Sequence, residues 1–466
     1  MGNVQTFGET LDELMRQRGI DAAQLGSWLG GRQNLSRLLR DEASIKRMSE
    51  ALALLSADLL PPEDIKRLSR AMEVNRLGKA DFEIQCALHK LVFHSDMPQY
   101  GDIHMENGTS LSAYLCRFGG GEPLNILCVN CLDSGVFSAF RDLLSDPQRR
   151  VKVRHYVNVN AESRNPARIF LAVGSTLFDR RYSLYTASNA HYGQDAFLLL
   201  PYLLFVQSGG AQAVLSIRAD GTARVLSTGR RANVFEAAQR LLSALPSDTT
   251  LLTGETAEAM KLDVMLFDRY QREKNRALYM IRPDPDTSLM PPQVQLSLWR
   301  DAAFPSVSQR AQHRVESIIR GRYAHFQKRL KPAYFILSPD QTRRFFQTGR
   351  QSSQPSCFRA CTPSERVEIL QSLLSALHAN KRLHLRFLKP GHEIHNHQFW
   401  GHEGFGVVIR PKGRQGAAIP RELVVRDASF QTQFKGFVLD TLPRGFTYDE
   451  PESLALLESM RMEIKI

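Results

Sequence analysis

The first 78 residues show apolar positions at the spacing of several short helices. The first group lies three and four positions apart, which places it on one helix face: Leu11, Leu14 and Met15. Gly19 follows as a residue that tolerates the left-handed conformation of a helix end, so the first helix is expected to stop there. Asp21 is a favourable N-cap residue and predicts a second helix over residues 22–29.

The second helix is expected to direct three residues toward a small core: Leu25, Trp28 and Leu29. Gly26 lets another helix approach closely, and Gly30-Gly31 then interrupts the chain. A third helix follows over residues 32–39, with Leu35, Leu38 and Leu39 as its apolar residues. A fourth helix, a fifth that opens at Pro61-Pro62 and a connecting helix over residues 80–93 complete the segment.

The polar side chains of the third helix are of the types that read and hold DNA. Arginine forks onto the O6 and N7 atoms of guanine, asparagine and glutamine pair with adenine, and serine or arginine can hold the phosphate backbone. In a two-helix unit joined by a tight turn, the second helix places its N-terminal residues in the major groove. We therefore expect DNA-binding residues at Arg32, Gln33, Asn34, Ser36, Arg37 and Arg40.

Short motifs in this segment resemble the Cro/C1-type helix-turn-helix of the XRE family: Leu11-x-x-Leu14, Gly19-Ile20-Asp21, Leu25-Gly26-x-x-Leu29-Gly30 and Leu35-Ser36-Arg37. The turn is one residue shorter than is usual in that family, and Ala22 stands where the family commonly has a phosphate-binding glutamine. The resemblance implies the DNA-binding domain of a transcriptional regulator. The residues alone also fit a plain helical bundle, or a degenerate domain kept for dimerisation.

Short sequence motifs further along the chain are similar to those of larger helix-turn-helix regulators of gut Firmicutes. They lie at residues 60–63, 72–78, 334–341, 346–349, 362–366 and 388–391. The resemblance implies double-stranded DNA as a partner. A homodimer is expected as well, because one short recognition helix reads few bases and two-fold pairing adds affinity.

The segment 106–250 alternates between strand and helix patterns. A buried strand over residues 124–132, a helix over 134–144 and an alternating strand over 151–159 suggest a βαβ unit. Asp220-Gly221 between two apolar runs is a strong hairpin signal, and a helix follows over residues 234–245. We expect an α/β region that serves as a sensor.

The segment 251–466 is expected to be mostly helical at first and α+β later. Long helices are predicted over residues 255–276 and 307–330, and Thr362-Pro-Ser-Glu365 has the form of a capping box that opens a helix to about His378. Strands near 382–388, 405–410 and 421–426 precede a final pair of helices. The whole chain is thus expected to be multidomain: an all-α helix-turn-helix domain (1–78), a connecting helix and linker (79–105), and the α/β (106–250) and α+β (251–466) regions.

The positive net charge of the chain makes a polyanion a plausible partner. The 466 residues carry a formal net charge of +12 at pH 7. Within residues 31–47, five basic side chains face only Asp41 and Glu42: Arg32, Arg37, Arg40, Lys46 and Arg47. Residues 309–332 hold seven basic side chains against Glu316, which suggests either a second phosphate-contacting surface or a solvated helix face.

No arrangement of residues points to catalysis or to a metal. His392, His395, His397 and His402 cluster beside Glu393 and Glu403, but they lack the spacing of a helical zinc motif, so a polar loop is expected over residues 392–402. Cys128 and Cys131 lie inside an apolar strand pattern, where thiols act as small hydrophobes, and Cys357 and Cys361 could join them in a four-thiolate site only if the fold brought the pairs together. We expect no cofactor, no metal and no catalytic residue.

The chain carries no stretch of the length and apolarity of a signal peptide or membrane span, which predicts a cytoplasmic protein without a membrane partner. A DNA-binding domain needs only about 75 residues, so the long remainder suggests a sensing or dimerising region that responds to a small-molecule effector of unknown identity. The expected function is a sequence-specific transcriptional regulator and not an enzyme. The alternative is an enzyme or a defence-type effector whose N-terminal helices only recruit partners.

Overall fold

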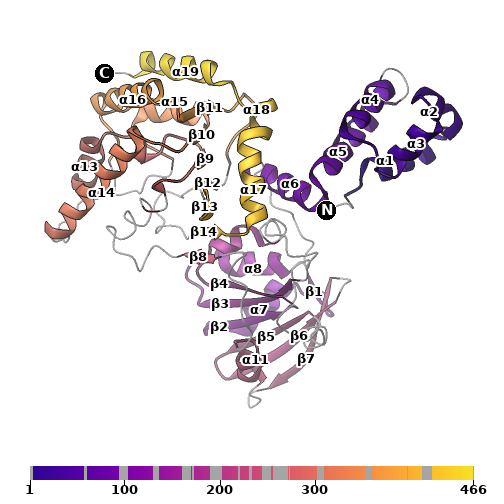
Figure 1. Cartoon of the computed structure of the whole chain (residues 1–466). Coiled ribbons are helices and arrows are strands. Elements are labelled where there is room, and N and C mark those ends of the chain that lie inside the picture. The colour runs from indigo at the N-terminus through magenta and orange to yellow at the C-terminus, as the bar shows by residue number, and fades with distance from the viewer. Residues whose placement is uncertain are drawn as a thin grey trace. The chain divides into compact units, whose positions relative to one another are not determined.

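The computed structural model describes residues 4–56, 60–93, 103–129, 136–159, 169, 173–188, 202–218, 221–229, 234–243, 253–255, 271, 273–301, 309–352, 359–395, 397–411 and 422–464. The chain divides into two compact units, Met1–Ala87 and Leu88–Ile466, and the division falls inside helix α6 (Lys79–Phe93) (Figure 1). The expectation of a multidomain chain is thus confirmed at this coarse level. Each unit is described by itself.

The described residues of the first unit form helices. These are α1 (Phe7–Arg18), α2 (Ala22–Trp28), α3 (Arg32–Leu39), α4 (Ile45–Ser56), α5 (Pro62–Leu77) and the start of α6. Their apolar faces meet in one core that includes Leu11, Leu14, Leu25, Leu35, Leu38 and Leu68. The predicted bounds of the third helix agree with the structure, and the second ends one residue early because Leu29 is its C-cap. Trp28 was expected in the core, but it is 41% exposed.

The second unit contains two seven-stranded mixed sheets. The first has the strand order β1-β7-β6-β5-β2-β3-β4. Its strands are β1 (His104–Met105), β2 (Leu124–Val129), β3 (Val151–Val159), β4 (Tyr182–Ser188), β5 (Leu203–Ser208), β6 (Ala211–Ile217) and β7 (Thr222–Gly229). β2 and β3 pair in parallel on either side of α8 (Val136–Ser145) in the chain, and β6 and β7 pair antiparallel, so both the βαβ unit and the hairpin are confirmed.

Helices cover both faces of this sheet. Phe137 and Phe140 of α8 pack beside His155 of β3, whereas Tyr156, the next residue, clusters with Phe235 and Leu242 of α11 (Val234–Ser243). Neighbouring residues of a strand point to opposite faces, so α8 and α11 lie on opposite sides. The remaining elements of this part are α7 (Leu111–Gly119) and the 3₁₀ turn η1 (Gly174–Phe178).

The second sheet has the order β11-β10-β9-β12-β13-β14-β8, and β9, β10 and β11 are parallel. Its strands are β8 (Thr253–Glu255), β9 (Leu278–Arg282), β10 (Ala333–Leu337), β11 (Leu383–Phe387), β12 (His397–His402), β13 (Gly406–Pro411) and β14 (Glu422–Val425). Around it lie η4 (Thr287–Leu289), α13 (Pro292–Asp301), α14 (Gln309–Gln327), α15 (Pro339–Thr348), α16 (Pro363–Ala379), α17 (Ala428–Gly436), η5 (Phe437–Thr441), α18 (Leu442–Gly445), α19 (Glu450–Ser459) and η6 (Met460–Glu463).

The expectation of mostly helical structure after residue 254 missed two strands. β9 and β10 lie inside the second sheet, and α13 and α14 come between them in the chain. All residues of β9 and nearly all of β10 are buried. Such a strand reads as a short continuous apolar run, and because polar and apolar residues do not alternate in it, the sequence pattern does not identify it as a strand. The helix predicted over 255–276 lies mostly outside the described residues, and its first residue, Glu255, ends strand β8. Strand β12 was not predicted either, and it holds two of the histidines that were expected in a loop.

Candidate nucleic-acid interface

Helices α2 and α3 are joined by a turn that depends on two glycines. The Asp21 carboxylate accepts from the backbone N–H of Gln24 at 3.1 Å and caps the start of α2. Gly30 and Gly31 then have φ angles of 80° and 123°, values that side chains with a Cβ atom rarely adopt. The chain reverses within these two residues and α3 begins at once.

Asn34 closes this turn. Its amide nitrogen donates to the carbonyl oxygens of Leu29 at 3.1 Å and Gly30 at 3.3 Å, and so satisfies groups left open at the end of α2. The side chain that was expected to read a base therefore has a structural role in this conformation. A contact of Asn34 with DNA stays a prediction, and a bidentate contact with adenine, which also uses the amide nitrogen, would require these bonds to break.

The outer face of α3 carries exposed cations while its inner face is held in the core. Leu35 and Leu38 are 4% and 3% exposed. Four of the predicted DNA-binding residues are exposed, namely Arg32, Gln33, Arg37 and Arg40, and Ser36 is half-buried. Among the described residues, the three guanidinium groups are not used in any ion pair of the unit. They keep their N–H donors available for a phosphate or a base edge.

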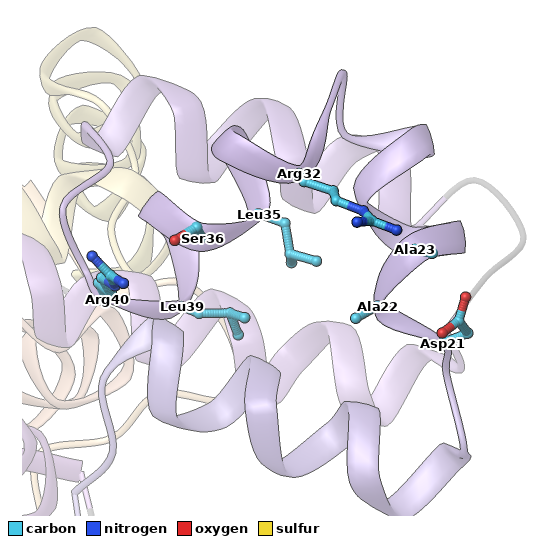
Figure 2. Close-up of a pocket in the computed structure, with 8 residues that line it drawn as sticks. All are labelled: Asp21, Ala22, Ala23, Arg32, Leu35, Ser36, Leu39 and Arg40. Carbon is cyan, nitrogen blue, oxygen red and sulfur yellow. The ribbon is translucent and has the colours of Figure 1, made fainter.

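A groove of about 520 Å³ runs between the start of α2 and the side of α3 that faces it (Figure 2). Asp21, Ala22 and Ala23 form one wall. The opposite wall has Arg32 near one end and Arg40 near the other, with Leu35 and Leu39 between them. Because a helix rises 1.5 Å per residue, the two arginines are about 12 Å apart along α3, and the groove presents a cation at each end of an apolar floor.

The back of α3 is fixed by contacts that sequence reasoning missed. A Cβ atom on Gly8 of α1 would lie 2.4 Å from the carbonyl oxygen of Leu39 and 2.8 Å from that of Leu38, so the two backbones touch. Directly after α3, Asp41 takes a left-handed φ of 57°. Its Oδ1 atom accepts from the backbone N–H of Gly8 at 2.8 Å and from the amide of Asn75 at 2.7 Å.

These contacts predict a strong effect of Gly8→Ala. The added methyl group cannot be accommodated by a flexible side chain, because both nearest atoms belong to the backbone of α3. We expect the first unit to lose about 1–3 kcal/mol of unfolding free energy, the usual range for overpacking, and α3 to shift from α1. Chemical denaturation measures the loss. Gly445→Ala is the control, because its Cβ would meet nothing within 4 Å, and equal stability of both variants would contradict this packing.

The histidine-rich segment is only partly a loop. His397 and His402 lie in β12, whose six residues are all buried, so the expected polar loop ends before His397. The ring of His397 stacks on Phe178 with centroids 5.4 Å apart, and burial lowers its pKa to about 4. His392 packs against Phe93 and Phe446 instead. Over the described residues, no group of His, Cys, Asp and Glu side chains is arranged to hold a metal ion.

Of the four cysteines considered for a thiolate site, the structure describes Cys128 and Cys361. Cys131 and Cys357 lie outside the described residues. Cys128 is fully buried in β2, as expected for a thiol that acts as a small hydrophobe. Burial raises the pKa of the Cys361 thiol to about 11, which disfavours the thiolate that metal binding needs.

The basic segment 309–332 is not one continuous cationic surface. Arg322 and Arg329 are 4% and 3% exposed, and Arg322 pairs with Glu273 and Asp286. Arg310, Arg314, Arg320, Lys328 and Lys331 are exposed. These five exposed side chains fit the second interpretation of the segment, a solvated helix face.

The described segments also bear on membrane association. None of their helices combines the length and apolar character needed to cross a bilayer.

Comparison with known proteins gives no family for this chain. No protein-family model matches it, and neither does any curated protein. Among solved structures, it is similar to a polyphosphate kinase from Porphyromonas gingivalis, with 9% identity and a TM-score of 0.21 over 70% of this chain and 47% of that chain. It is also similar to a phosphatidylserine synthase from Haemophilus influenzae Rd KW20, with 8% identity and a TM-score of 0.27 over 82% and 97%. The chain thus spans less than half of the polyphosphate kinase, and TM-scores this low carry no argument about fold or function.

Proposed function

We propose that this protein is a DNA-binding transcriptional regulator whose first unit holds a duplex through α3. The observation that carries the proposal is the outer face of α3, where Arg32, Arg37 and Arg40 are exposed while Leu35 and Leu38 anchor the opposite side. A helix that follows a tight glycine turn and presents its polar face outward has the geometry of a recognition helix in the major groove. Arginine donors then suit both guanine edges and phosphates.

The size of the chain supports a second role for the second unit. Unit Leu88–Ile466 has its own sheets and cores and holds most of the residues. We propose that it senses a small-molecule effector, supports a homodimer, or does both, and that it changes the population of the DNA-binding conformation. Pairing of two copies would place two α3 helices on half-sites about one helical turn apart.

The test is binding of the purified full chain to duplex DNA. Genome-wide enrichment of bound fragments supplies the operator, and gel shifts then measure the affinity as the salt concentration rises. We expect the affinity to fall steeply with salt, because each phosphate contact releases condensed counterions. The absence of any shifted duplex at low salt would sink the regulator proposal and leave the recruiting enzyme or effector as the better hypothesis.

Variants locate the interface. Arg32→Ala combined with Arg37→Ala is expected to abolish operator preference while the unit stays folded, because neither guanidinium packs in the core. Each lost bidentate base contact costs about 1–3 kcal/mol of discrimination. The matched control is Arg16→Ala combined with Arg76→Ala, which removes the same charge from α1 and α5 at side chains that are 78% and 37% exposed. Footprints that stay unchanged in the double variant would refute the assignment of α3.

A further inference from the structure

A small cavity lies on the second sheet, far along the chain from α3. Its floor is made by β10 and β11, where Tyr334 and His384 are register partners and their rings stack with centroids 4.5 Å apart and planes 10° apart. Tyr279 of β9 extends the stack on the other side of Tyr334 at 5.6 Å. The aromatic row fixes the His384 ring in one plane at the edge of the cavity.

The walls come from the helices that cover this part of the sheet. Val438, Leu439 and Pro443 contribute apolar atoms, and Glu450 closes one side at the start of α19. Val438 and Leu439 belong to η5, a π-helical turn, a rare geometry that is often found at functional sites. The enclosed volume is about 60 Å³. One probe sphere of roughly 10–15 Å³ holds a water molecule, so the space suits a small polyatomic ion.

The partner of His384 decides which nitrogen of its ring acts as the donor. Its Nδ1 atom lies 3.1 Å and 3.2 Å from the two carboxylate oxygens of Glu450. An ionised carboxylate can only accept, so Nδ1 carries the proton that is donated. The Nε2 atom is then the ring position left to meet a ligand.

Arg386 is the second cation of the cavity and is weakly engaged. Its Nη1 atom donates to the carbonyl oxygen of Tyr448 at 3.4 Å, and its Nη2 atom lies 3.8 Å from Glu450, beyond hydrogen-bond distance. The side chain is 25% exposed. A guanidinium offers five N–H donors in a planar fork that matches the oxygens of carboxylates and phosphates. Most of this capacity is unused in the structure.

We propose that this cavity binds a small oxyanion, a phosphate or a carboxylate group, through Arg386 and His384. Glu450 orients the imidazole, and the apolar walls exclude water and strengthen the charged contacts. Arg386 supplies a positive charge for the ligand, and a proton taken up together with the anion makes the Nε2 atom of His384 a second donor. The proposal does not depend on DNA binding by the first unit.

The test is a titration of the full chain with inorganic phosphate and, separately, acetate in a chloride buffer. Selective ¹⁵N labelling of histidine reports on His384, whose resonances are assigned by their loss in His384→Gln. We expect the His384 signals of the unaltered protein to move and saturate with at least one of the two anions, and the better anion identifies the source of the oxyanion. A linear drift without saturation for both anions would overturn the proposal.

Two variants distinguish binding in this cavity from a general effect of the protein's positive charge. Arg386→Gln is expected to weaken binding about tenfold, the effect of one lost charge-assisted hydrogen bond. Arg382→Gln removes the same charge from an exposed position just before β11 and is expected to leave binding within about twofold. Far-UV circular dichroism confirms that Arg386→Gln is folded. Equal weakening in both folded variants would overturn the assignment of Arg386.

Discussion

Arg322→Ala is expected to lower the unfolding free energy of the second unit by about 3–5 kcal/mol, the range for breaking a buried ion pair from one side. The Nε and Nη2 atoms of Arg322 each lie 2.6 Å from a different oxygen of Glu273, and Nη2 is also 3.0 Å from Asp286. Glu273 and Asp286 are 3% and 0% exposed. Loss of the guanidinium removes the cation that these two buried carboxylates share, although Asp286 keeps its ion pair with Arg282.

Urea denaturation of the full chain measures this effect, with the two units followed as separate transitions. Arg320→Ala is the matched control, because Arg320 lies on the same helix, is 61% exposed and pairs with Glu316 one turn earlier. Such a surface pair contributes about 0.3–0.5 kcal/mol. Similar losses in both variants would mean that the buried network contributes no more than a surface pair.

The buried role of Arg322 was in principle visible in the sequence. Five buried residues of α14 follow the spacing of one helical stripe: Val315, Ile318, Ile319, Arg322 and Phe326. Arg322 thus occupies a position where the pattern requires an apolar residue. Sorting the charges of the segment by helical face separates Arg322 from the exposed cations, whereas the net charge does not. Its partner could not be predicted, because Glu273 lies 49 positions away.

The elements of the first unit were predictable because their signals are local. Asp21 at a helix start and Gly30-Gly31 at a turn act on their immediate neighbours, and the bounds of α2 and α3 follow from them. Asp41 has no such signal. Its function depends on Gly8 and Asn75, which lie 33 and 34 positions away, and only the packing of α1 and α5 brings them together.

Strands of the second sheet were harder to predict, because they depend on contacts between distant parts of the chain. His397 and His402 were placed in a loop because histidine and asparagine lower the apolar count, yet β12 is buried between β9 and β13. Pairing with two neighbouring strands satisfies its backbone and overrides the weak local preference. The oxyanion cavity was invisible for a related reason, since Tyr334, His384 and Glu450 come from three separate elements.

Acid is expected to destabilise the second unit from pH 6.5 downward. His155 is 0% exposed, and burial lowers its pKa from 6.5 to about 3, while the pKa of His397 is lowered to about 4. Both rings are therefore neutral in the folded chain, and the unfolded chain takes up their protons first. Stability is fully present above pH 6.5 and falls as the pH decreases, by about 1.4 kcal/mol per pH unit for each histidine until its folded pKa is reached.

The slope of the unfolding free energy against pH tests this sign and its source. His155→Gln is expected to reduce the slope between pH 6 and pH 4.5 by about 1.4 kcal/mol per pH unit, because the contribution of His155 is lost while those of His397 and of His325, whose pKa is also lowered by burial, remain. The amide of glutamine can still meet the hydroxyl group of Tyr182, which lies 2.7 Å from the Nδ1 atom of His155. Any constant loss of stability cancels in the slope. A slope that is the same in His155→Gln and the unaltered protein would show that His155 accepts its proton without unfolding.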